Sequence, residues 1–161
     1  MVWRGLRRLG VPETFIEDAA QDVFVVVHRR LPDFEGRSSI KTWLYGIVLR
    51  VAKDHRRAQV RQAQRVERAQ LLSLYSNSTR TPIDEAERRE ANRVLHALLE
   101  ELHEDHREVL VLVEMEGLSV RDTAAVLGLR VRACQRRLRA AHMAFEKKLA
   151  RYLQPDGRQA Q

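Results

Sequence analysis

The sequence predicts an all-α protein made of two small helical domains joined by a flexible linker. Apolar residues recur every three or four positions in successive segments, and no segment alternates apolar and polar residues as a strand would. The periodicity fades only between residues 63 and 80, where polar residues dominate. We therefore expect domains at residues 1–62 and 81–152, with a disordered tail at 153–161.

Composition limits the function before any motif is considered. The 161 residues carry a formal net charge of +7, with 44% apolar and 32% charged residues. This balance favours globular cores and a polyanionic partner, nucleic acid first and an anionic membrane surface second. No apolar run approaches the roughly 20 residues of a membrane span, and the N-terminus lacks the apolar region of a secretory signal. A single cysteine excludes an internal disulfide and fits a reducing compartment. Together these features predict a cytoplasmic protein without membrane insertion.

In the first domain a short helix over residues 3–9 precedes a longer one that ends near residue 31. Thr14 and Glu17 form a capping box that is expected to open the longer helix. The short helix has an inward stripe of Trp3, Leu6 and Leu9. The inward stripe of the longer helix comprises Ile16, Ala20, Val23, Phe24, Val27 and Leu31. Its outward face is acidic and carries Glu17, Asp18, Gln21 and Asp22.

A third helix follows the loop at residues 32–37 and is capped by Ser38 or Ser39. Its expected inward residues are Ile40, Trp43, Leu44, Ile47 and Val51. Further along, this helix becomes basic through Lys53, His55, Arg56, Arg57 and Arg61. Aromatic rings beside cations suit single-stranded nucleic acid, since bases stack on the rings while cations follow the phosphates. Packing in the core is the alternative for the ring of Trp43.

The second domain opens with Thr81 as N-cap and Pro82 and Asp84 in the first turn of a helix. The inward face of this helix comprises Ala91, Val94, Leu95, Leu98 and Leu102. A break is expected near His103, and the apolar residues 109–115 are expected to form the buried centre of the domain.

Residues 116–145 predict two helices joined by a glycine turn. Ser119 and Asp122 cap the first helix, and Gly128 ends it because glycine enters the left-handed conformation at little cost. The buried face of this helix comprises Val120, Thr123, Ala124 and Leu127. The second helix starts near Val131 and turns Val131, Cys134, Leu138, Ala141 and Phe145 inward. Its outward row comprises Arg132, Gln135, Arg136 and Arg139.

This arrangement matches a helix-turn-helix whose second helix enters the DNA major groove. Two plainer interpretations remain open from the segment alone: a solvated arginine face and an ordinary packing unit of an all-α protein.

The order of motifs resembles the extracytoplasmic-function (ECF) subfamily of bacterial sigma-70 factors. The segments EDAAQDVF and KTWLYGI resemble sigma region 2, and REVLVL, EGLS and AAVLGL resemble region 4. The resemblance implies that region 2 binds the β′ coiled coil of core RNA polymerase and opens the −10 element, while region 4 binds the −35 element. It also implies the β flap of the polymerase and an anti-sigma factor as candidate partners.

The resemblance implies roles for individual residues. The polymerase-binding set is Asp18, Gln21, Asp22 and Phe24. The −10 set is Phe34, Ser39, Lys41, Trp43 and Tyr45, with Lys53, Asp54, Arg56 and Arg57 on the duplex upstream. The −35 set has two parts. Arg107, Ser119 and Arg121 would bind phosphates, since a helix N-terminus is an anion site. Arg132, Gln135, Arg136 and Arg139 would enter the major groove.

The chain also departs from the family pattern. Family members usually begin well before the position of Trp3, so we expect a first helix that packs with less area than a full-length one. The segment at 130–138 reads RVRACQRRL where the family usually reads PVGTVKSRL. The extra arginines favour phosphate attraction and leave the base preference open.

Three other functions are alternatives to an active sigma factor. A degenerate sigma-like protein could bind partners without starting transcription. A different helix-turn-helix regulator would explain residues 116–145 but not the aromatic and basic third helix. A zinc site of His103, His106 and Cys134 lacks a fourth ligand. We expect no metal, no cofactor and no enzymatic activity.

Overall fold

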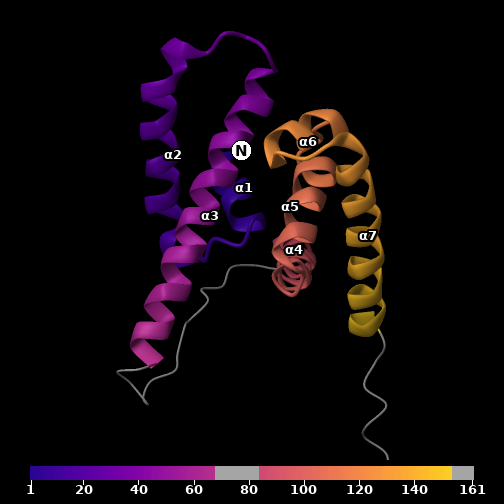
Figure 1. The fold of residues 1–161 in the computed structure, drawn as a ribbon. Helices are drawn as coiled ribbons and strands as arrows, with labels where there is room; N and C mark the ends of the chain where they lie inside the picture. Colours follow the sequence, from indigo (N-terminus) through magenta and orange to yellow (C-terminus); the bar gives the residue numbers. More distant parts are fainter. Residues whose placement is uncertain (68–83, 154–161) are drawn as a thin grey trace, which may run out of the picture. The chain divides into compact units, whose positions relative to one another are not determined.

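The structure, a computed structural model, describes residues 1–67 and 84–153 (Figure 1). Within these residues it contains seven α-helices and no strand, which confirms the predicted all-α fold. The described chain forms two compact units, Met1–Asp33 with Ile47–His96 and Phe34–Gly46 with the residues from Ala97 onward. Most of the predicted linker and all but the first residue of the predicted tail lie outside the described residues.

In the first unit, α1 (Val2–Arg8) and α2 (Ile16–Arg30) pack against each other, and the body of α3 (Ile40–Glu67) completes the layer (Figure 1). Leu6 and Leu9 are fully buried, as their spacing predicted. The core side of α2 is narrow and consists of Ile16, Ala19, Ala20 and Val23. From α3 the unit buries Ile47, Val48, Leu49, Val51 and Ala52.

The predicted Thr14 capping box is wrong. The 3₁₀ turn η1 (Glu13–Phe15) leads into α2, which begins at Ile16 with Phe15 as its N-cap and no side-chain cap bond. Pro12 is extended, and its carbonyl accepts the Phe15 amide at 2.9 Å. This hydrogen bond gives the Phe15 amide a backbone acceptor at the start of α2, so a side-chain hydroxyl is not needed there.

Several apolar residues predicted to point inward are exposed instead. Phe24 and Trp3 leave 48% and 49% of their surfaces exposed. At 100° per residue, Phe24 lies about 80° round the helix axis from Ile16, at the margin of the buried stripe. Leu31 belongs to η2 (Leu31–Asp33), beyond the end of α2, where the helical projection no longer applies. Ile40, the first residue of α3, is also exposed.

The second unit is built around α5 (Glu104–Leu110), which continues as the π-helical turn η3 (Val111–Met115). Val109, Leu110, Val111 and Leu112 are buried, which confirms most of the predicted centre. The break falls at His103, whose ring Nδ1 accepts the Asp105 amide at 3.3 Å as the N-cap of α5.

The preceding helix α4 (Asp84–Glu100) buries Leu98 and Leu99 near its end, whereas Ala91 is exposed against expectation. The predicted N-cap of this helix, Thr81, lies outside the described residues.

Candidate nucleic-acid interface

Helices α6 (Val120–Leu127) and α7 (Val131–Leu153) form the predicted helix-turn-helix. The Ser119 hydroxyl accepts the Asp122 amide at 3.0 Å and donates to the Asp122 carboxylate at 2.6 Å. These bonds confirm Ser119 as the N-cap of α6. The hydroxyl that caps the helix is therefore held in one orientation at its N-terminus.

The turn between the helices is fixed by backbone geometry. Gly128 has φ +66°, the left-handed conformation predicted for it. The Leu129 amide donates to the Ala124 carbonyl at 2.8 Å, and the amides of Ala133 and Cys134 donate to the Arg130 carbonyl at 2.9 and 3.0 Å. Arg130 is therefore the N-cap of α7. These bonds set the direction in which α7 leaves the turn.

The inner side of α7 packs on α5 and α6. Cys134 and Ala141 are buried there, and Leu138 and Phe145 are half-buried. Val131, predicted inward, is 42% exposed because it occupies the first position of the helix, where the neighbouring turn does not cover it.

Three side-chain pairs fasten this inner side to the rest of the unit. Arg137 donates to Asp105 at 2.8 Å, His142 contacts Glu114 at 3.0 Å, and Lys148 donates to Glu101 at 2.9 Å. They occur at three levels along α7. These partly exposed pairs add to the packing of the inner side on α5 and α6, which sets the rotation of α7 about its own axis.

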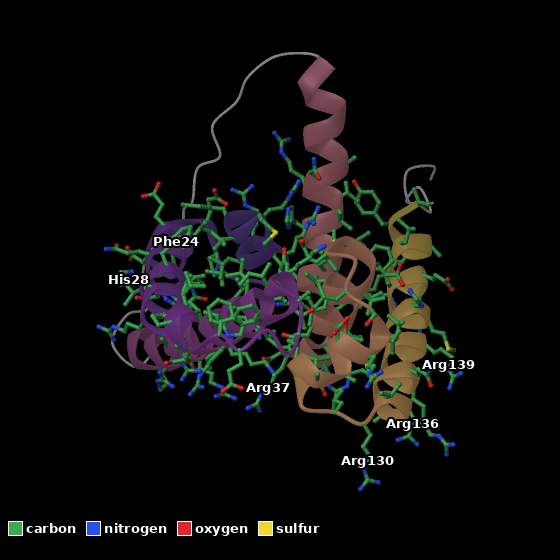
Figure 2. All side chains as sticks on the ribbon, turned by 90° about the horizontal axis from the view of Figure 1, so that it is seen from above. Phe24, His28, Arg37, Arg130, Arg136 and Arg139 are labelled. Carbon is green, nitrogen blue, oxygen red and sulfur yellow. The ribbon has the colours of Figure 1, made fainter. Side chains whose placement is uncertain are left out.

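The outer row of α7 is the surface that remains for a partner. All four of its residues, Arg132, Gln135, Arg136 and Arg139, are exposed. Arg136 and Arg139 project away from the body of the unit in Figure 2. This exposed row presents three guanidinium groups and one amide to solvent, a set able to bind phosphates and base edges.

The other members of the predicted −35 set lie in different surroundings. Arg121 is exposed on the first turn of α6, close to the cap at Ser119. Arg107 is half-buried, and its guanidinium donates to the carbonyls of Leu99 and Glu100 at 2.7 Å and of Leu102 at 3.2 Å. Arg107 therefore holds the carbonyls at the end of α4, and its phosphate contact stays a prediction.

Two of the predicted −10 residues, Phe34 from the loop and Trp43 from the start of α3, form an aromatic pair within the second unit. The rings of Phe34 and Trp43 meet at 5.3 Å with an interplanar angle of 52°, and both are half-buried. Ser39 accepts the Thr42 amide at 3.0 Å, which resolves the cap of α3 in favour of Ser39.

Two further −10 residues near the start of α3 lie in opposite environments. Lys41 is exposed, whereas Tyr45 is fully buried and its hydroxyl donates to the Glu116 carboxylate.

The predicted duplex contacts at residues 53–57 of α3 differ in their exposure and in their contacts. Asp54 and Arg57 are exposed, and Lys53 is half-buried. The Arg56 guanidinium instead donates to the carbonyl of Leu9, at the end of α1. Of these four predicted duplex contacts, Arg56 has an evident structural role as well.

The predicted polymerase-binding set lies together on the exposed side of α2. Asp18, Gln21, Asp22 and Phe24 are all exposed. Asp22 contacts His55 of α3 at 2.8 Å, and Phe24 meets the ring of Trp3 at 5.6 Å. Figure 2 shows Phe24 at the edge of its unit, on the same helix as His28.

Sequence reasoning missed two features of these surfaces. It placed Trp3 inside, although the ring widens the apolar surface at Phe24. It counted Arg130 among the extra arginines that favour phosphate attraction but left it out of the −35 set, and this residue is exposed at the turn before α7. The substitution of arginine where the family usually has proline was the available signal.

Among residues 1–67 and 84–153, no three His, Cys, Asp or Glu side chains gather in a way that could hold a metal ion. No helix in this part of the chain is both long enough and apolar enough to span a bilayer.

A helix-turn-helix with an outward basic row in the second unit, together with the acidic and aromatic side of α2 in the first unit, indicates a DNA-binding protein of the transcription machinery. Residues 1–62 match the family model for sigma-70 region 2, and residues 92–143 match that for sigma-70 region 4.

Individual relatives agree with the family models. The chain is 36% identical over 138 residues to the RNA polymerase sigma factor CnrH of Cupriavidus metallidurans, covering 82% of this chain and 72% of the relative. It is 30% identical over 149 residues to the ECF RNA polymerase sigma-E factor of Escherichia coli K12, covering 86% and 76%.

Two solved structures have the same fold. CnrH in complex with the cytosolic domain of CnrY aligns with a TM-score of 0.67 at 29% identity, covering 92% of this chain and 80% of that one. The sigma factor RpoE of Bartonella quintana, in complex with the anti-sigma factor NepR, aligns with a TM-score of 0.68 at 23% identity and 92% coverage of both chains.

The chain belongs to the ECF subfamily of sigma-70 factors. The predicted identity as an RNA polymerase sigma factor is confirmed, and the partners of such a factor are core RNA polymerase and promoter DNA.

Proposed function

We propose that this sigma factor binds core RNA polymerase through the exposed side of α2 and reads the −35 element through the outer row of α7. The aromatic and basic residues at 34–57 would act on the −10 element. The chain acts by binding and positioning rather than by catalysis, and it does so in the cytoplasm, where polymerase and promoters are found.

The observation that supports −35 recognition best is that the polar side chains of α7 fall into a paired group and an exposed group. Arg137, His142 and Lys148 are held by carboxylates on the inner side, whereas Arg132, Arg136 and Arg139 are exposed on the other. Because α7 is already oriented in the free protein, DNA binding loses little entropy in orienting this row.

An anti-sigma factor is a further proposed partner. The comparison structures of CnrH and RpoE were solved with CnrY and NepR respectively. The exposed rings of Trp3 and Phe24, beside the acidic residues of α2, offer such a partner an amphipathic surface.

Transcription with purified components tests the proposal. The full chain would be combined with core polymerase on a library of genomic fragments, and the 5′ ends of the transcripts would be sequenced. We expect transcripts that start downstream of one shared pair of promoter elements, and their loss in the Arg132→Ala/Arg136→Ala double variant.

Two outcomes would contradict the proposal in different ways. Tight binding to core polymerase without promoter-dependent RNA would indicate a sigma-like regulator that does not initiate. Sequence-specific DNA binding without affinity for core polymerase would indicate an independent regulator.

A further inference from the structure

Arg130 lies outside the outer row of α7, at the turn that precedes this helix. It is exposed, and no residue in the described part of the chain forms an ion pair with it. No aspartate or glutamate occurs between Asp122 and Glu146, while five arginines do. Within this stretch of sequence, no acidic residue offsets the charge of Arg130.

The backbone around Arg130 is ordered by hydrogen bonds rather than left as an open loop. Its carbonyl accepts two amides of α7, at 2.9 and 3.0 Å, and the preceding residue Leu129 is tied to Ala124 at 2.8 Å. The Arg130 side chain therefore projects from a fixed backbone position just before the N-terminus of α7. Little backbone entropy would be lost when it binds a partner.

The direction of the side chain separates it from the outer row of α7. Figure 2 shows Arg130 at the tip of the turn, while Arg136 and Arg139 leave the side of α7. A helix lying in the major groove directs one side at base edges, whereas its ends approach the sugar–phosphate backbones that border the groove. The positive end of the helix dipole adds to the attraction there.

We propose that Arg130 binds a DNA backbone phosphate at the border of the groove that α7 enters. This inference rests on the proposed function of α7. Arg130 would add affinity without sequence preference, because phosphates are the same at every base pair.

Salt-dependent binding of the full chain to a duplex of random sequence tests this role. Removing one contact between a cation and a phosphate reduces the magnitude of the slope of log K against log salt by about 0.9. We expect Arg130→Gln to lower the slope by this amount and Arg130→Lys to retain it. Arg139→Gln serves as the positive reference, and Arg151→Gln, at the far end of α7, as the control without effect.

Each outcome decides one of the two proposals. A wild-type slope for Arg130→Gln beside a lowered slope for Arg139→Gln would overturn the role of Arg130 and leave the function of α7 intact. A change of base preference in Arg130→Gln on a randomised −35 library would reassign it to base reading. Absence of salt-dependent DNA binding by the wild-type chain would overturn the proposed function itself.

Discussion

Arg137 of α7 donates to Asp105 of α5 at 2.8 Å, so one arginine of the recognition helix is directed away from the surface that the others occupy. Its immediate neighbour Arg136 is exposed. Adjacent residues on a helix point about 100° apart, which is enough to separate a positioning residue from a reading residue. The pair joins two segments that are 32 residues apart in sequence.

We predict that breaking this pair loosens the orientation of α7. Both partners are partly exposed, so Arg137→Gln should cost only about 0.5–1 kcal/mol in unfolding free energy. The larger effect should be a weaker base preference on a randomised −35 library, with the salt slope unchanged. Circular dichroism melting and library binding would measure the two quantities.

The charge-reversed double variant Arg137→Asp/Asp105→Arg is the matched control, and it should regain base preference that either single variant loses. If Arg137→Gln lowered the salt slope while Asp105→Asn had no effect, Arg137 would be a phosphate contact rather than a positioning residue.

Arg107 leads to a prediction about stability. Its guanidinium donates to the carbonyls of Leu99 and Glu100 at 2.7 Å, where α4 ends. Arg107→Gln should lower the unfolding free energy by about 2 kcal/mol, since charged hydrogen bonds at a part-buried site are lost. Arg121→Gln is the comparison: this side chain is exposed, so we expect a lower DNA salt slope with little change in melting temperature. A lowered salt slope in both variants would support the predicted phosphate role of Arg107.

The sequence predicted those features that depend on neighbours within one turn. Ser119 and Gly128 were identified because a cap and a left-handed glycine are local geometries. The outer row of α7 followed from helical period alone. The start of α2 was not identified, because the Thr14 pattern resembles a cap and only the extended conformation of Pro12 shows that a 3₁₀ turn replaces it.

What sequence could not supply is the pairing of distant segments. His142 with Glu114 and Lys148 with Glu101 join positions 28 and 47 residues apart. The hydrogen bond from the Arg56 guanidinium to the Leu9 carbonyl also joins positions 47 residues apart. An arginine in a basic stretch has the same local pattern whether it faces a phosphate or a helix end, so tertiary contacts alone separate the two.

Phe24 and Val23 form a matched pair for testing the polymerase surface. Val23 is fully buried and Phe24 is half exposed, although they are consecutive residues of α2. Val23→Ala should lower the unfolding free energy by about 2 kcal/mol, through lost burial and a residual cavity. Phe24→Ala should weaken binding to core polymerase severalfold with a smaller loss of stability. Equal core affinity in wild type and Phe24→Ala would remove this residue from the interface.

The thiol of Cys134 should be chemically inert in the folded protein. The side chain is fully buried, and burial raises its pKa above the ordinary thiol range, while the positive charge of Arg137 lowers it by less. Because the folded pKa is the higher one, the unfolding free energy should fall as pH rises above the unfolded pKa and through the folded one. Thiol reagent should label native protein slowly and denatured protein at once, and rapid labelling at neutral pH would contradict the assignment.

The last prediction concerns the division of labour within the outer row of α7. Arg132, Gln135 and Arg136 lie in the N-terminal half of the helix, the part that reaches base edges when such a helix docks. Arginine binds guanine and glutamine binds adenine through two hydrogen bonds, each pair contributing roughly 1–3 kcal/mol of discrimination. Arg139 lies a turn further along and should meet a phosphate. Arg132→Ala and Arg136→Ala should therefore each relax the preference at one −35 position.

Binding curves on a randomised −35 library at two salt concentrations measure both effects. Arg139→Ala should weaken all sequences alike and lower the salt slope by about 0.9. Gln135→Ala, which removes no charge, should change base preference while the slope stays as in wild type. If all three arginine variants lost affinity uniformly with base preference intact, α7 would hold the DNA backbone without reading it. The specificity of the chain would then have to come from its region 2.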